Sequence, residues 1–291
     1  MLKPRPIDHL VLAVRDLDAG RATYAKLGFT VAPVAQHPFG TANSVVQMDG
    51  SYLELLAVTD AGRIPPATPT RFSFGAFNRE YLQRREGFSA LVLQSDGAAA
   101  DIADFAAHDL PTYELTKFER TARGPDGVER PLAFSLAYTS DARVHGQAAF
   151  FTCQHHHPEN FWRSEYQRHA NGAVRVDSAV FVTRDPADFH IFFTWFTGQH
   201  DILATSLHNR FALGSNSVDV MSPVGFRAFF GEDAGADPRR LTAYRIAVAN
   251  LRATRALLKG NDVPFAELHE ALVVPSTFAH GSALAFVRSR L

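Results

Sequence analysis

The sequence predicts an α+β fold in which four βαβββ modules pair into two domains. Two observations lead to this prediction. The opening residues alternate in the order strand, helix and three strands, and the first strand recurs in weaker form at three later points. A chain of 291 residues with 46% hydrophobic residues can bury two such cores. We place the first domain at residues 1–170 and the second at residues 171–291.

Local signals define each element of the first module. Asp16 is a typical N-cap, and Gly28 a typical C-terminal residue, for a helix over residues 19–26. Apolar runs bounded by Gly, Pro and Asp predict the strands around this helix. The expected strands are residues 7–14, 29–34, 44–48 and 50–57.

The later modules repeat this order with less similarity. Their first strands are expected near residues 88–93, 176–182 and 244–251, and their helices over residues 98–107, 186–196 and 252–259. Segments rich in Pro and Gly separate them, at residues 64–69, 157–159 and 231–238. The first module is most similar to the third and the second to the fourth, which indicates duplication of a two-module ancestor.

One ionisable residue stands near the middle of each of two largely apolar strands. His9 lies in the strand Ile-Asp-His-Leu-Val-Leu-Ala-Val, and Glu54 in Ser-Tyr-Leu-Glu-Leu-Leu-Ala. Burying either group is costly unless it is paired or bound to a metal. An imidazole and a carboxylate together supply half of a metal site. The alternative is a hydrogen-bonded core histidine and an edge-strand charge.

With these residues the chain resembles the glyoxalase, or vicinal-oxygen-chelate, superfamily. The resemblance rests on DHLVLAVRDL followed by YLELL, and it weakens in the later modules. It implies two glyoxalase-like open-barrel domains, each with a cup-shaped cavity. It also implies metal ligands on the first and fourth strands of a module, where His9 and Glu54 lie.

The other modules lack ligands at the matching positions. Ala90, Ser178 and Ala243 stand in place of His9. Asp219 and Ala285 stand in place of Glu54 in the third and fourth modules. We therefore expect a degenerate second domain without a catalytic metal. This differs from the ring-cleaving dioxygenases of the superfamily, whose metal lies in the later modules.

A third ligand is expected from the strand that ends in three histidines, residues 148–157. We align Thr152 with Glu54, so that strand alternation turns Gln154 and His156 into the cup and His155 away from it. His156 is thus the favoured ligand. The alternative for the three histidines is a solvated strand end. The lone Cys153 is expected to be inert.

Three residues are expected to contact the substrate. Gln154 shares the predicted cup face, and Asn43 lies in the loop before the third strand. Arg71, in the first connector, is a candidate for binding a carboxylate. An ordinary turn and a solvated charge are the alternatives for Asn43 and Arg71.

Composition excludes several classes of function. A net charge of −1 argues against nucleic acid as the main partner, and no apolar run approaches the roughly 20 residues of a membrane span. A single cysteine and no leader-like N-terminus favour a cytoplasmic protein. Phosphate-binding loops and a GxSxG motif are absent. We expect a small-molecule partner, with no nucleic acid and no membrane, and a homodimer as one option.

The resemblance then implies an enzyme that depends on a divalent metal ion, which could be Zn, Fe, Mn or Ni. The ion would chelate two neighbouring oxygens of a small substrate, and Glu54 could also act as a general base. Isomerase or lyase chemistry is favoured over ring cleavage. The alternatives are a metal-free protein that sequesters a small molecule, as resistance proteins of the superfamily do, and a scaffold without a ligand.

Overall fold

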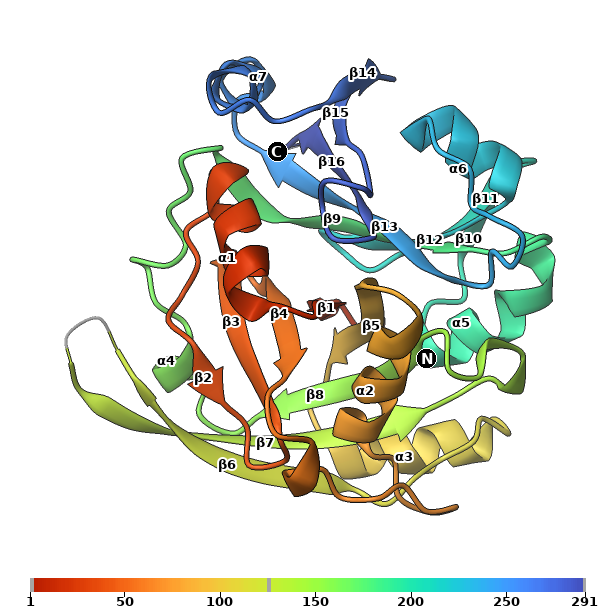
Figure 1. Ribbon diagram of the computed structural model, residues 1–291. Helices are drawn as coiled ribbons and strands as arrows, with labels where there is room; N and C mark the ends of the chain where they lie inside the picture. The colour runs from red at the N-terminus through yellow and green to blue at the C-terminus, as the bar shows by residue number, and fades with distance from the viewer. Residues whose placement is uncertain (1–2, 125–126, 290–291) are drawn as a thin grey trace.

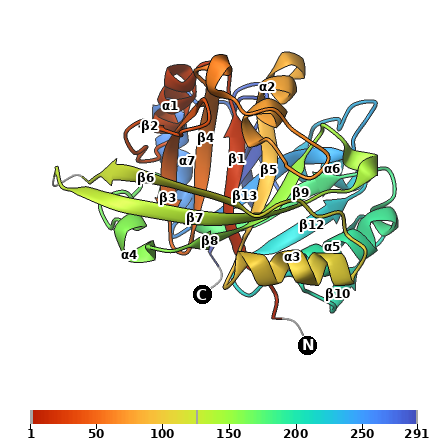
Figure 2. The same ribbon diagram turned by 90° about the horizontal axis from the view of Figure 1, so that it is seen from below.

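The computed structural model describes residues 3–124 and 127–289, which form two eight-stranded sheets (Figures 1 and 2). The first sheet has the order β2-β3-β4-β1-β5-β8-β7-β6 and the second β10-β11-β12-β9-β13-β16-β15-β14. The first contains β1 (Ile7–Ala13), β2 (Ala35–Gln36), β3 (Thr41–Met48), β4 (Ser51–Val58), β5 (Gly87–Gln94), β6 (Thr116–Arg123), β7 (Glu129–Thr139) and β8 (Ala149–His155). The second contains β9 (Ala173–Val182), β10 (Ile202–Ala204), β11 (His208–Ala212), β12 (Ser217–Met221), β13 (Arg240–Val248), β14 (Ala266–Leu268), β15 (Ala271–Val274) and β16 (Ala283–Arg288).

Each module contributes one main helix after its first strand. These helices are α1 (Leu17–Lys26), α3 (Ala98–Ala107), α5 (His190–Thr197) and α7 (Leu251–Gly260). The connectors carry α2 (Phe74–Arg84), α4 (Pro158–Phe161) and α6 (Pro223–Phe230), and the short turns η1 (Ala61–Arg63), η2 (Ala142–Val144) and η3 (Pro186–Phe189). The predicted α+β fold of four paired βαβββ modules is confirmed.

One local prediction was wrong. Residues 29–34 form no strand, and β2 is a two-residue strand further along; Pro33, which has no N–H to donate, interrupts the expected run. The connector after β4 also contains a helix, α2, for which no prediction was made. The Ser73 hydroxyl accepts the Ala76 N–H as an N-cap, and Tyr81 and Leu82 bury against Ala13 of β1.

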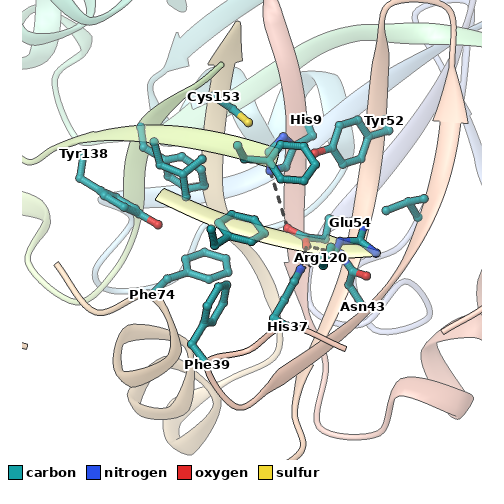
Figure 3. Close-up of a pocket in the computed structure, with 15 residues that line it drawn as sticks. His9, His37, Phe39, Asn43, Tyr52, Glu54, Phe74, Arg120, Tyr138 and Cys153 are labelled. Atoms are coloured by element: carbon teal, nitrogen blue, oxygen red, sulfur yellow. Dashed lines mark hydrogen bonds and ion pairs between the residues drawn. The ribbon is translucent and has the colours of Figure 1, made fainter. Parts of the chain in front are cut away.

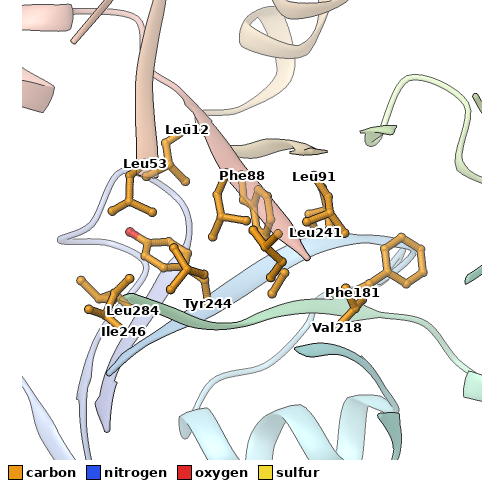
Figure 4. Packing of buried hydrophobic residues seen from close by; sticks show 14 of the residues in the cluster. Leu12, Leu53, Phe88, Leu91, Phe181, Val218, Leu241, Tyr244, Ile246 and Leu284 are labelled. Atoms are coloured by element: carbon orange, nitrogen blue, oxygen red, sulfur yellow. The ribbon is translucent and has the colours of Figure 1, made fainter. Parts of the chain in front are cut away.

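The main hydrophobic core lies between the two sheets (Figure 4). Leu12, Leu53 and Phe88 of the first sheet face Leu241 and Tyr244 of the second in this cluster. The opposite face of each sheet carries a separate, smaller cluster. The two sheets therefore pack against each other through one face of each. The opposite, curved face of each sheet, here called a cup, packs against the connectors of its own modules. In the described residues, no helix combines the length and apolar character needed to cross a bilayer.

Candidate metal centre in the first cup

His9 and Glu54 meet in the first cup (Figure 3). Strands β1 and β4 are parallel neighbours, and their register pairs Val11 with Glu54. Both side chains are buried, at 4% and 6% exposure. His9 Nε2 lies 3.6 Å from Glu54 Oε2. The two residues singled out by the sequence therefore share one site.

A β-bulge at Asp8 adds a third polar group that the sequence analysis missed. The pairing of β1 with β5 shifts register between Ile7 and His9, so Asp8 is the extra residue. Asp8 Oδ1 lies 2.6 Å from His9 Nδ1. Burial alone would raise the pKa of Asp8, but the neighbouring His155 and His9 hold it well below its usual range. A charged Asp8 fixes the His9 ring so that Nε2 points at Glu54.

His37 approaches Glu54 from the other side. Its Nε2 lies 3.7 Å from Glu54 Oε1, and its Nδ1 lies 2.8 Å from the Thr41 hydroxyl. Burial lowers the pKa of His37 to about 4, although Glu54 acts in the opposite direction. The ring is therefore neutral at neutral pH, which is the form that binds metals.

The turn that carries His37 is held by close packing. Gly40 has φ +81°, and an added Cβ would lie 2.2 Å from the Asp60 carbonyl oxygen. Only glycine fits there without a shift of the backbone. The His37 ring stacks on Phe39, with ring centroids 4.9 Å apart. The sequence of residues 37–40 by itself predicts only a turn.

Asn43 also reaches the carboxylate. Its Nδ2 donates to Glu54 Oε1 at 2.6 Å and lies 3.3 Å from His37 Nε2. Asn43, expected in a loop, lies within β3 and lines the cavity, and its role toward a substrate stays a prediction. In this arrangement its amide positions the carboxylate between the two imidazoles.

Aromatic side chains close the pocket around these groups. Tyr52 stacks on the His9 ring with centroids 4.4 Å apart. The cavity has a volume of about 40 Å³, and Phe74, Phe118, Phe134, Tyr138 and Phe151 complete most of its wall. It borders a second cavity of about 300 Å³ and shares Asn43, Val45 and Arg120 with it. The small cavity, which contains the polar groups around Glu54 within an aromatic wall, thus adjoins a larger cavity.

The predicted orientation of β8 was wrong by one residue. Val11 pairs with Glu54 in the first module and Val92 pairs with Phe151 in the second, so Phe151, not Thr152, matches Glu54. Thr152 donates to Asp101 of α3, outside the cup. Strand alternation then turns Cys153 toward the pocket, which it lines.

Three expected site residues, two of them on or next to β8, lie outside the cavity that contains Glu54. His156 Nε2 lies 2.8 Å from the Ser135 hydroxyl, and Gln154 Oε1 accepts the Ala98 N–H at the start of α3. Arg71 is exposed and donates to the Pro66 carbonyl. None of the three lines the cavity that contains His9 and Glu54.

Asp8 also belongs to a second group of residues whose side chains could bind a metal ion. Ligand atoms of Asp8, Cys153 and His155 all lie within 4.8 Å of one another. His155 Nε2 is 3.2 Å from Asp8 Oδ2. Burial, with added repulsion from Asp8 and Glu54, raises the pKa of the Cys153 thiol well above its usual value. The thiol is thus protonated in the absence of a metal, which disfavours it as a ligand.

Comparison with known proteins gives the family. A model of the glyoxalase-like domain matches residues 7–196, which is more than half of the chain. The chain belongs to the glyoxalase-like domain family. No match was found among curated proteins.

Solved structures share the fold at low sequence identity. A hypothetical protein from Staphylococcus aureus superimposes with a TM-score of 0.68 at 12% identity, over 97% of this chain and 99% of the other. The Mn(II)-bound glyoxalase from Novosphingobium aromaticivorans gives 0.57 at 10% identity, over 99% and 85%. A mutant of 4-hydroxymandelate synthase from Streptomyces coelicolor gives 0.56 at 10%, over 98% and 92%. These likenesses show the glyoxalase-like fold alone.

Members of this superfamily often depend on a metal, and the donors in the first cup fit one. His9 and His37 each have Nδ1 engaged by Asp8 or Thr41, which leaves both Nε2 atoms facing one carboxylate. Two ligands that hold one ion at about 2.1 Å lie roughly 3.4 Å apart at tetrahedral angles. His9 lies 3.6 Å from Glu54 Oε2 and His37 lies 3.7 Å from Glu54 Oε1, so each imidazole is close to that value with a different carboxylate oxygen. Binding of one shared ion requires the three side chains to move closer together.

Proposed function

We propose that the first cup holds a divalent metal ion on His9, His37 and Glu54, and that the protein is a glyoxalase-like enzyme of the isomerase or lyase type. Its substrate would be a small molecule with two neighbouring oxygens. The observation that carries the proposal is the convergence of two oriented Nε2 atoms on the buried Glu54 carboxylate. When bound, the ion would polarise the substrate oxygens as a Lewis acid.

The chain's own residues would do the rest of the chemistry. Asp8 holds His9 in one orientation, and Asn43 holds Glu54 through a 2.6 Å hydrogen bond. The proton to be moved would be taken up by Glu54, the one carboxylate that lines the small cavity. The aromatic wall excludes water and strengthens these electrostatic contacts.

Elemental analysis tests the proposal directly. Protein purified without chelator or metal-affinity resin should contain close to one equivalent of a divalent metal, and the ion found decides among Zn, Fe, Mn and Ni. His9→Ala, His37→Ala and Glu54→Gln should each weaken metal binding by about 10-fold or more. His156→Ala is the matched control, since it removes a histidine of the same sheet outside the pocket.

Two outcomes would contradict this assignment. Wild-type metal content in all three variants would remove the ion from His9, His37 and Glu54. Loss of metal only in Cys153→Ala and His155→Ala would instead place the ion on the Asp8, Cys153 and His155 group. Metal identity alone would not separate these sites, so the variants are essential.

A metal-free binding protein is the second candidate. The aromatic wall and the larger neighbouring cavity favour it, because both suit the burial of a small organic molecule. In that case the wild-type protein would take up no Zn, Mn, Fe or Ni when each is offered. Glu54→Gln would then change the binding of a ligand, with no metal involved.

A further inference from the structure

Arg120 is a guanidinium without a carboxylate partner at the boundary of the two cavities. It lies on β6 between Phe118 and Ala122, which also face the cup, and it lines both cavities. Figure 3 shows it beside Asn43 and Glu54. Among the residues that the structure describes, no carboxylate oxygen lies within 4.0 Å of it, and its buried Nε has no hydrogen-bond partner. Burial lowers the pKa of Arg120, and Glu54 opposes that shift from a distance.

Among the residues that the structure describes, the charged side chains that line the larger cavity are all cationic. They are Arg120 and Arg163, and no described Asp or Glu lines it. Arg163 is held in place, because its N–H donates to Gln47 Oε1 at 2.9 Å and its Nη2 donates to the Asn160 carbonyl at 3.1 Å. Two arginines that line one cavity of about 300 Å³ form a binding environment for an oxyanion.

Metal binding at Glu54 would make the surroundings of Arg120 more positive and would therefore favour the binding of an anion. Glu54 makes the largest contribution in favour of a charged Arg120, since its carboxylate opposes the lowering of the pKa of Arg120 by burial. In the proposed function this carboxylate is committed to a divalent cation, so its charge no longer compensates Arg120. The site then needs a negative group from outside the chain, since buried charges are stable only when they are paired.

We propose that the substrate carries an oxyanion, a carboxylate or a phosphate-type group, at the end remote from its two neighbouring oxygens. The neighbouring oxygens occupy the small cavity at His9, His37 and Glu54, and the oxyanion lies in the larger cavity between Arg120 and Arg163. The proposal rests on the proposed function for the first of these contacts only. It names the substrate class as a small acid with a distal negative charge.

Matched probes test this assignment. 2-Oxoglutarate and 2-oxopentanoate share the same 2-oxo acid end and the same chain length, and they differ in a terminal carboxylate or methyl group. Titration calorimetry on the metal-loaded protein should show 2-oxoglutarate binding roughly 10- to 100-fold more tightly. A third probe, the same acid with a terminal phosphonate, distinguishes the two oxyanion sources by which of them binds more tightly.

Variants link the preference to the arginines. Arg120→Met should abolish the preference for 2-oxoglutarate, because it weakens the binding of 2-oxoglutarate far more than that of 2-oxopentanoate, in samples matched for metal content. Arg163→Met should reduce the same preference. Because Arg163 lies on a different segment, this second variant keeps the proposal testable if Arg120→Met does not fold. Arg71→Met is the control, because Arg71 is an exposed arginine outside both cavities.

Equal affinities for the two acids in the wild type would overturn the proposal, as would an Arg120→Met variant that keeps the preference. Failure of the proposed function is detected separately, as absence of metal before any ligand is added. In that case glutarate and pentanoate are compared on the metal-free protein. A preference for glutarate that depends on Arg120 then supports the oxyanion cavity, and equal binding refutes it.

Discussion

The two cups share one topology but use the same strand position in opposite ways. In the first, Glu54 on β4 faces two histidines, and its nearest side-chain partner is the Asn43 amide. In the second, Asp219 occupies the corresponding position on β12 and is fully buried. Arg210 binds it through two hydrogen bonds of 2.7 and 2.8 Å, and Arg245 adds a third at 2.7 Å.

The connectors extend this difference. In the first cup, α2 brings Phe74 to the wall of an open cavity. In the second, α6 inserts Phe226 and Phe230 into the apolar cluster of the cup, and the Arg245 guanidinium lies 4.9 Å from the Phe230 ring centre. A carboxylate matched by fixed cations is a structural ion pair. A carboxylate that faces two imidazoles and an amide remains available to a metal ion.

The largest expected effect is on stability in the second cup. Asp219→Asn removes the charge that compensates Arg210 and Arg245, so we expect a loss of about 3–5 kcal/mol in the free energy of unfolding. Glu54→Gln, the matched change in the first cup, breaks no direct ion pair and removes only the more distant charge that favours a charged Arg120, so it should cost less than Asp219→Asn in the metal-free protein. Urea denaturation measures both. Similar losses in the two variants would show that the cups do not differ as described.

The pH dependence of stability should separate the cups next. The pKa of His37 is lowered to about 4 in the folded protein, against 6.5 for an ordinary histidine. Between these values the unfolded chain binds a proton that the folded protein does not, so stability falls as pH decreases through this window, by up to about 3 kcal/mol. The pKa of Asp219 is below the ordinary value of 3.8, because Arg210 and Arg245 outweigh the effect of burial. Its contribution is therefore present above that value and is lost only at lower pH.

His37→Asn isolates the first of these effects. Burial also lowers the pKa values of His169 and His208, so the quantity of interest is the difference between wild type and variant in metal-free urea denaturation from pH 7 to pH 4. This difference should change with pH by most of the stated amount. A difference that is independent of pH would mean that His37 is protonated in the folded protein at pH values near 6.

The sequence was sufficient for the fold and for half of the site. The helix over residues 98–107 was predicted with the bounds that the structure has, since the repeat of the module places a helix after each first strand. His9 and Glu54 were found because an ionisable residue within a largely apolar strand can be recognised from the sequence alone. Their pairing followed from the parallel neighbours β1 and β4.

The other site residues depend on features that periodicity does not encode. Asp8 turns to the same side as His9 only because of a bulge, which breaks strict alternation. His37 lies in a turn whose position depends on contacts of Gly40 with a distant connector. Arg120 lies on a β-hairpin strand that no motif distinguished. In β8 an apolar run with a polar end fits two registers equally, and the contact of Thr152 with α3 decides between them.

The smallest effect is expected from the two neighbouring histidines at the end of β8. His155 Nε2 lies 3.2 Å from Asp8 Oδ2, and its ring packs edge-on against Phe134 and Phe161. His156→Ala removes only the hydrogen bond to Ser135, so it should cost about 1 kcal/mol of stability and leave metal affinity unchanged. His155→Ala removes a partner of the buried Asp8 carboxylate, which orients His9, and should therefore weaken metal binding measurably. Denaturation and metal titration of the two variants rank them, and a larger loss of metal affinity in His156→Ala would place His156, as first expected from the sequence, inside the cup.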